Sequence, residues 1–147
     1  MKILHKSTGL TLYVPEPIKD AAAQLFDTGI SAGFPSPTED FSQERLSLDQ
    51  ELVKNKETTF YARVSGQSMI GAGLDDNDLL VIDRSLEPEN NKIAVCFLDG
   101  EFTVKRLRVT KDEIWLKPEN PDYPIINITE ENNFLIWGIV TNVIKKV

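Results

Sequence analysis

The sequence predicts a mainly β fold, built from short strands that begin near residue 58 and continue to the C-terminus. Apolar and polar residues alternate with a period of two in several short runs of this region. Asp99-Gly100 joins two such runs, and this dipeptide between alternating runs is a strong β-hairpin signal. Breaks rich in Asn or Pro, such as Pro118–Pro124, separate other runs. We therefore expect one β-rich domain over residues 58–147, with no internal repeat.

The composition is that of a single globular domain. The chain has 147 residues, of which 41% are apolar and 27% charged, and this balance argues against a disordered chain. The single cysteine, Cys96, excludes an intrachain disulfide, and the single histidine, His5, leaves too few ligands for a usual zinc site. We expect no metal and no cofactor, and we expect a hydrolase of this composition to work without histidine.

The charge of the chain limits its partners. Its 23 Asp and Glu against 16 Lys and Arg give a net charge of −7, which disfavours direct binding to duplex DNA. Residues 1–32 hold three basic and three acidic groups and are therefore not a basic arm. The sequence shows neither a secretion signal nor an apolar run of the ~18 residues that a membrane span needs. We expect a cytoplasmic protein that does not bind membranes.

The first third of the chain differs from the rest. A strand is expected at Leu10–Val14 and a short helix at Lys19–Phe26, and Pro35 and Pro37 should hold the following linker extended and exposed. A second helix is expected within residues 38–50, with Thr38 as its candidate cap. These elements predict three parts: an extended N-terminal arm, 1–32; a linker with a short helical segment, 33–57; and the β-rich domain, 58–147.

The strands of the β-rich domain follow from alternation and from the breaks between runs. They are expected at Thr58–Val64, Leu79–Asp83, Ile93–Leu98, Phe102–Val109, Glu113–Lys117 and Phe134–Ile144. Both faces of the last strand are apolar, and strict alternation would place Trp137 and Ile139 on the same face. A strand with two apolar faces is central in its sheet or covered by a partner chain.

A cluster of carboxylates at Asp75, Asp76 and Asp78 resembles part of a calcium loop. The central glycine and the terminal glutamate of such a loop are missing, and Asp78 leads directly into a predicted strand. We therefore interpret this segment as a solvated acidic turn.

The turn after the first predicted strand of this domain is a candidate site, because Ser68 follows Ser65-Gly66-Gln67 where a short helical turn could begin. Backbone N–H groups at such a start point outward, so those of Ser68 and Met69 could hold a developing oxyanion. A serine in this place is more often only a helix cap. Local sequence alone favours that structural interpretation by about four to one.

Lys105 is the second candidate. Alternation along Phe102–Val109 places Lys105 on the same face as Thr103 and Leu107. Desolvation on a largely apolar face lowers the pKa of a lysine, and action as a base near neutral pH needs a drop of roughly 3 units. The commoner structural interpretation is a lysine that extends to solvent from a sheet edge. A serine nucleophile with a lysine base would nevertheless need no histidine.

Three segments carry a family resemblance: Gly33-Phe34-Pro35-Ser36-Pro37, Ser65-Gly66-Gln67-Ser68-Met69 and Asp99-Gly100-Glu101-Phe102-Thr103-Val104-Lys105. In this order and spacing they resemble the UmuD group of the LexA-like self-cleaving serine peptidases, peptidase S24, over nearly all of residues 29–147. The resemblance implies that Ser68 is the nucleophile and Lys105 its general base. It also implies that the bond cut is Ala32–Gly33, which would release the N-terminal arm.

The same resemblance implies a biological role. Members of this group act in the SOS response to DNA damage as homodimers, and a RecA–single-stranded-DNA filament stimulates their cutting. The cut form serves a UmuC-type error-prone DNA polymerase in translesion synthesis. Two positions depart from the expected pattern: Gln67 replaces a frequent Asp, and Asn77 replaces a frequent Gly in a turn where Asn tolerates left-handed backbone.

Two alternatives remain open at this point. A LexA-like transcriptional repressor would need an N-terminal DNA-reading domain, and about 32 residues without net charge show no recognition-helix pattern. A non-catalytic interaction module would keep Ser68 and Lys105 as relics. Only a self-cleaving peptidase would shorten when the pure protein is incubated.

Overall fold

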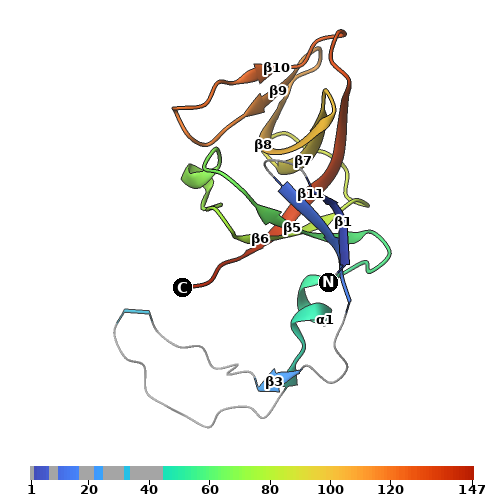
Figure 1. Ribbon diagram of the computed structural model, residues 1–147, viewed down its shortest axis with the longest axis vertical. Helices are drawn as coiled ribbons and strands as arrows, with labels where there is room; N and C mark the ends of the chain where they lie inside the picture. Colours follow the sequence, from blue (N-terminus) through green and yellow to red (C-terminus); the bar gives the residue numbers. More distant parts are fainter. Residues whose placement is uncertain (1, 7–9, 17–21, 25–31, 34–44) are drawn as a thin grey trace. The chain divides into compact units, whose positions relative to one another are not determined.

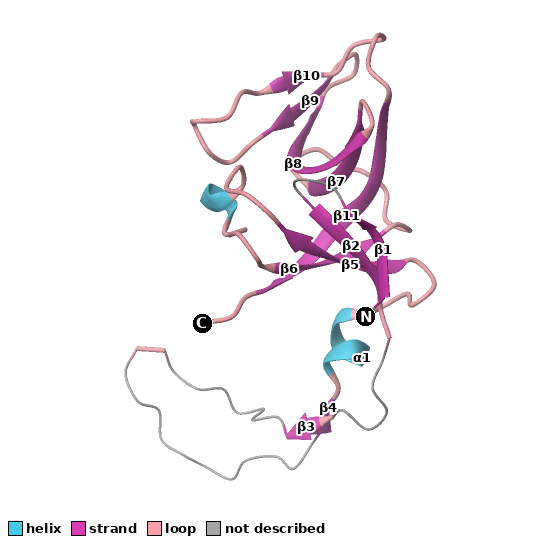
Figure 2. Ribbon diagram, in the orientation of Figure 1, coloured by secondary structure: helices cyan, strands magenta, loops and turns pink. Residues whose placement is uncertain are grey.

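The computed structural model describes residues 2–6, 10–16, 22–24, 32–33 and 45–147 (Figure 1). Contacts group the chain into two compact units, Met1–Glu16 together with Asn55–Val147, and Pro17–Lys54. The described residues are mainly strands, as the sequence predicts, with one short α-helix and one 3-10 turn (Figure 2).

One antiparallel sheet of nine strands forms the first unit, in the order β1-β2-β5-β6-β11-β7-β8-β9-β10. Each strand is bonded to a neighbour close in sequence, except where β2 joins β5 and where β11 lies between β6 and β7. The strands are β1 Lys2–Lys6, β2 Leu10–Val14, β5 Thr59–Val64, β6 Leu79–Asp83, β7 Ile93–Leu98, β8 Glu101–Val109, β9 Ile114–Lys117, β10 Ile126–Asn127 and β11 Phe134–Ile144.

The strand predictions are confirmed. Four predicted strands have the observed bounds, and the other three differ by one residue at their first position. Asp99 and Gly100 form the β7–β8 turn, both with positive φ, as the hairpin signal requires. Alternation did not indicate β1 or β10. β1 carries exposed Ile3 and Leu4, and β10 has only two residues, so neither presents the periodic pattern of a half-buried strand.

The prediction of a helix at Lys19–Phe26 is wrong for the part of this segment that the structure describes, residues 22–24. Ala23–Gln24 forms strand β3, which pairs with β4, Arg45–Leu46, in a separate two-stranded sheet. The Arg45 guanidinium also donates to the carbonyl of Ala22. An isolated helix of this length is unstable in water, so pairing with a distant segment outweighs its local helical preference. The rest of the predicted helix lies outside the described residues.

The helix predicted within residues 38–50 is shorter than expected. Helix α1 covers Leu48–Leu52, because Arg45–Leu46 is taken up by β4. Thr38, the expected cap, lies outside the described residues, as do Pro35 and Pro37 of the predicted linker.

Strand β11 is central in the sheet. The sequence offered two explanations for its two apolar faces, a central position or cover by a partner chain, and the first is confirmed. Its first half pairs with β7 and its second half with β6. The register shifts between Ile136 and Gly138, which breaks strict alternation. Trp137 consequently packs against one hydrophobic cluster and Ile139 belongs to another, so the prediction of a shared face is wrong. Gly138 leaves no room for a side chain, because a Cβ there would lie 2.6 Å from a methyl carbon of Ile82.

Two hydrophobic clusters form the core of the first unit. The first cluster joins β2, β5, β6, β7 and β8 to the segment after β5, and its buried members are Leu10, Leu12, Ala62, Val64, Met69, Leu74, Leu80, Ile82, Val95 and Val104. The second cluster consists of Ala94, Cys96, Leu107, Leu116 and Ile139. The first cluster includes Met69, so the residue that follows Ser68 is anchored in the core.

Candidate active site

The turn that carries Ser68 begins where β5 ends. Gly66 adopts φ 103°, a left-handed conformation that side chains rarely take, and its N–H donates to the Asp76 carboxylate at 2.8 Å. The short 3-10 turn η1, Ile70–Ala72, follows Ser68 after one further residue. Ser68 is half-buried, while Met69 is 2% exposed. The buried methionine and the bonded glycine hold the serine between them.

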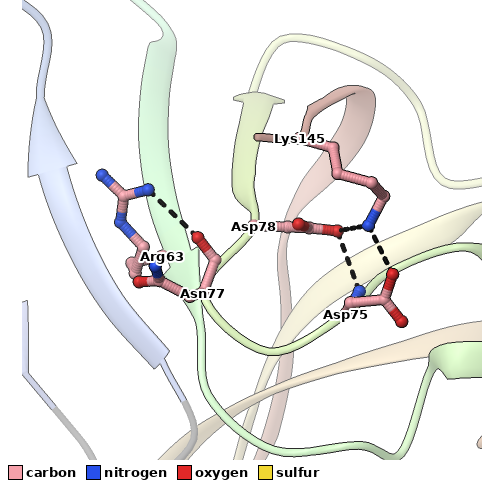
Figure 3. A network of polar contacts seen from close by, with 5 residues as sticks. All are labelled: Arg63, Asp75, Asn77, Asp78 and Lys145. Carbon is pink, nitrogen blue, oxygen red and sulfur yellow. Dashed lines mark hydrogen bonds and ion pairs between the residues drawn. The ribbon is translucent and has the colours of Figure 1, made fainter. Parts of the chain in front are cut away.

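The acidic turn before β6 is bonded to the end of β5, the strand that leads to Ser68. Val64 donates its N–H to the carbonyl of Asp78, and Asn77 donates its N–H to the carbonyl of Val64. Lys145, after β11, forms ion pairs with the carboxylates of both Asp75 and Asp78 (Figure 3). The C-terminal segment is thereby tied to the turn before β6.

The expectation of a solvated turn is correct for Asp75 and Asp76 and wrong for Asp78, which is buried. Burial by itself would raise the pKa of Asp78, but the hydrogen bonds from Lys145 and from the N–H of Asp75 lower it overall. One lysine therefore pairs with two carboxylates. Asn77 has φ 72°, a left-handed conformation that asparagine tolerates better than most residues.

Lys105 is buried on strand β8, with an exposed fraction of 8%. Its neighbour across the β7–β8 ladder is Ala94, and Thr103 faces Cys96. Val104 belongs to the first hydrophobic cluster and Leu107 to the second, as alternation predicts. Lys105 is thus held on an apolar strand face and does not extend to solvent from an edge.

Ser68 and Lys105 meet in the folded chain although 37 residues separate them. The Lys105 Nζ lies 3.2 Å from the Ser68 Oγ, 2.8 Å from the Thr103 Oγ1 and 3.1 Å from the Val104 carbonyl oxygen. A neutral amine has two N–H donors and one lone pair. If Thr103 and Val104 accept those two N–H groups, the lone pair is left for the serine hydroxyl, and such an arrangement would suit a general base.

The environment of Lys105 favours this neutral form. Burial lowers the pKa of Lys105, and the nearby Cys96 has a smaller effect in the opposite direction. Burial also raises the pKa of Cys96 to about 12, so the thiol carries no negative charge near neutral pH. Among the described residues, the ion pairs involve Arg106 and Lys145 and none involves Lys105. No carboxylate in this part of the chain therefore stabilises the ammonium ion.

The backbone beside Ser68 offers donors for an oxyanion. The N–H groups of Ser68 and Met69 form no hydrogen bond to any other described residue, whereas Ile70 and Gly71 donate to the carbonyls of Gln67 and Glu119. N–H groups that have no partner among the described residues and lie beside a serine hydroxyl could stabilise the oxyanion of a tetrahedral intermediate.

A network that sequence reasoning missed holds this turn against the segment after β9. The Asn120 side chain donates to the Gln67 carbonyl at 2.9 Å, and the Gly71 N–H donates to the Glu119 carbonyl at 2.7 Å. The Arg106 guanidinium, next to Lys105 in sequence, donates to the Glu119 carboxylate and lowers its pKa. These residues share no motif in the sequence, and only the folded sheet brings them together.

A cavity of about 350 Å³ opens beside the serine and the lysine. Phe102 on β8, Leu98 on β7 and Ile126 on β10 contribute apolar walls, and Tyr123 lies at the segment that connects β9 to β10. The cavity thus provides space for a peptide segment next to the Ser68 hydroxyl.

The predicted cleavage residues, Ala32 and Gly33, belong to the second unit. Both are exposed, and a Cβ at Gly33 would meet no atom within 4 Å. The residues that the sequence placed after Gly33 in an extended linker lie outside the described residues.

Comparison with known proteins decides the family. The model of the family described as Peptidase S24-like matches residues 24–141. The chain belongs to this family. It is 40% identical over 139 residues to Protein SamA of Salmonella typhimurium, covering 93% of this chain and 96% of SamA. It is 41% identical over 114 residues to Protein MucA of Escherichia coli, 77% of each chain.

A LexA repressor of Delftia acidovorans is 37% identical over 116 residues, which are 79% of this chain and 51% of the repressor. The family and these relatives confirm the resemblance to UmuD-like and LexA-like peptidases, and with it a serine peptidase kind of activity. Among the described residues, no helix has the length and apolar character of a membrane span.

Proposed function

We propose that the protein is a self-cleaving serine peptidase of the SOS response, which cuts its own Ala32–Gly33 bond with Ser68 as nucleophile and Lys105 as general base. The observation that carries this proposal is the 3.2 Å contact between the Lys105 Nζ and the Ser68 Oγ. Lys105 itself is buried on strand β8. Membership of the S24 family supports the same chemistry.

The first half of the reaction forms an ester. The Ser68 Oγ attacks the carbonyl carbon of Ala32 while the Lys105 amine takes the hydroxyl proton. The N–H groups of Ser68 and Met69 stabilise the negative charge on the carbonyl oxygen. The Ala32–Gly33 C–N bond then breaks, and Lys105 returns its proton to the leaving nitrogen of Gly33.

The second half releases the N-terminal fragment from the serine. Water attacks the ester carbonyl, and Lys105 takes a proton from that water. The bond to the Ser68 Oγ breaks, the serine recovers its proton from Lys105, and Ala32 is left with a free carboxylate. The products are residues 1–32 and residues 33–147, and the second contains the linker, 33–57, and the peptidase domain, 58–147.

The sequence around the cut suits this site. Ala32 places a small side chain next to the reacting carbonyl, and Gly33 allows a close approach of the backbone. Because substrate and enzyme are one chain, the effective concentration of the bond reaches roughly the millimolar range, so a weakly bound segment can still be cut.

The biological setting is part of the proposal. The names MucA, SamA and LexA among the relatives support a role in SOS mutagenesis. In this role the protein is a cytoplasmic homodimer, a RecA–single-stranded-DNA filament stimulates the cut, and the product is a subunit of a UmuC-type translesion polymerase. A repressor that reads duplex DNA is less well supported, because β1 and β2 of the described N-terminal residues are strands of the peptidase sheet.

Incubation of the purified full-length chain at alkaline pH tests the activity, with intact mass as the readout. We expect two fragments from the unmodified chain and none from Ser68→Ala under the same conditions. Equal fragmentation of both would show a contaminating protease. A folded chain that stays intact, also in the presence of a RecA filament, would favour a non-catalytic interaction module.

A further inference from the structure

Strand β2 precedes the proposed cut, yet it is an internal strand of the peptidase sheet. It lies between β1 and β5, and four of its residues face β5 in register: Leu10 opposite Val64, Thr11 opposite Arg63, Leu12 opposite Ala62 and Tyr13 opposite Tyr61 (Figure 2). The N-terminal segment thus supplies one of the two strands that pair with β5.

The side chains of β2 belong to the core as well. Leu10 and Leu12 are 0% and 1% exposed, and they pack in the first hydrophobic cluster with Ala62 and Val64 of β5. The same cluster includes Met69, which follows Ser68. Departure of β2 would expose this apolar surface and leave the backbone groups of β5 that face β2 without their partners.

A second strand pair also spans the proposed cut. β3 at Ala23–Gln24 lies before Ala32, and its partner β4 at Arg45–Leu46 lies after it. Hydrolysis of Ala32–Gly33 therefore breaks the covalent link between the two segments and breaks neither strand pair. The first segment of the peptidase unit ends at Glu16, so the cut falls outside that unit.

We propose that cutting leaves residues 1–32 bound to residues 33–147, with the β5 edge as a non-covalent binding site for the cut N-terminal peptide. The inference rests on the proposed cut and goes further, because it makes the processed form a complex of two chains. The binding determinants are the backbone of β5 and the apolar side chains that pack with Leu10 and Leu12 in the first hydrophobic cluster. Any other strand can pair with β5 only after the peptide leaves.

The test separates this proposal from the proposed activity by making the cut in two ways. The unmodified full-length chain is left to cut itself, and a Ser68→Ala chain with a recognition sequence for an added protease before Ser31 is cut by that protease. Both products are passed through a gel-filtration column at micromolar concentration, with and without guanidinium chloride. We expect the N-terminal peptide to co-elute with the large fragment without denaturant and to separate in it.

Two variants in the protease-cut chain locate the binding site. Leu12→Asp places a charge in the core and should release the peptide after the cut, whereas Leu4→Asp, at a 52% exposed position on β1, should not. If Leu12→Asp does not fold before cutting, amide hydrogen exchange of β5 in the unmodified sequence replaces it. The protection of Thr59–Val64 should then be the same before and after the cut.

Separate elution of the peptide without denaturant, or loss of protection along β5 after the cut, would overturn the proposal. A chain that fails to cut itself but retains the peptide after the added protease would overturn the proposed activity alone.

Discussion

Asn120 donates a hydrogen bond from its side chain to the carbonyl of Gln67, at 2.9 Å, and so fixes the residue before Ser68. The donor lies after β9 and the acceptor after β5, 53 residues apart in sequence. Asn120 is 8% exposed, so water does not readily replace this bond. The geometry of the Ser68 turn therefore depends on a residue that does not touch the reacting atoms.

We expect Asn120→Ala to slow self-cutting by about ten- to a hundredfold, because a small displacement of a nucleophile is costly in rate. Loss of the buried bond should also lower the free energy of unfolding by about 1–3 kcal/mol. The rate is measured by intact mass over time, and stability by urea unfolding. Asn133→Ala at an exposed position is the matched control, and an equal loss of rate in that variant would remove Asn120 from its positioning role.

Ser68→Ala and Lys105→Ala should each slow cutting by about a thousandfold or more while the chain stays folded. Nucleophile and base act as a unit, so the double variant should be scarcely slower than either single variant. Intact mass gives the rates, and circular dichroism checks the fold. Substantial cutting by one single variant would show that its residue does not have the assigned role.

The rate of cutting without an activator should rise with pH up to the pKa of Lys105. Burial lowers the pKa of Lys105, and only the deprotonated amine can accept the proton of Ser68. Below that pKa, the fraction of neutral amine grows about tenfold for each pH unit, and above it the rate levels off. Rates are measured across the pH range in which circular dichroism shows a folded chain. A rate that stays flat over the whole pH range in which the chain is folded would argue against a lysine base.

Ala32→Trp should block cutting at the predicted bond. A bulky side chain next to the reacting carbonyl does not suit a site that accepts alanine. Ala32 is exposed, so the substitution should change the free energy of unfolding by about 0.5 kcal/mol or less. Thermal unfolding and intact mass are measured on the same sample. Unimpaired cutting by this variant would mean that the substrate bond lies elsewhere.

Much of the sheet could be predicted from the sequence because its strands are short apolar or alternating runs separated by turn residues. The Asp99-Gly100 turn set the register of β7 and β8, and with it the face on which Lys105 lies. The register shift at Gly138 escaped prediction, since neither the shift nor the close approach of Ile82 from a neighbouring strand has a local sequence signal. Alternation alone then assigned Trp137 to the wrong face.

Only part of the candidate site could be predicted from the sequence. Local patterns made Ser68 and Lys105 candidates, but only a family resemblance joined them as a pair, because a serine in a turn and a lysine on a strand 37 residues later have no joint local signature. Asn120 and Glu119 were not found at all. Their contacts with the Ser68 turn arise only when the segment after β9 packs against it. The pairing of β3 with β4 likewise replaced an expected helix, because it depends on partners far apart in sequence.

The central claim is that Ser68 and Lys105 cut the chain between Ala32 and Gly33. N-terminal sequencing of the large fragment, formed by the purified chain at alkaline pH, tests it most directly. The account predicts that this fragment begins at Gly33 and that Ser68→Ala yields no such fragment. A fragment that begins at any other residue, or the same fragment from Ser68→Ala, would contradict it.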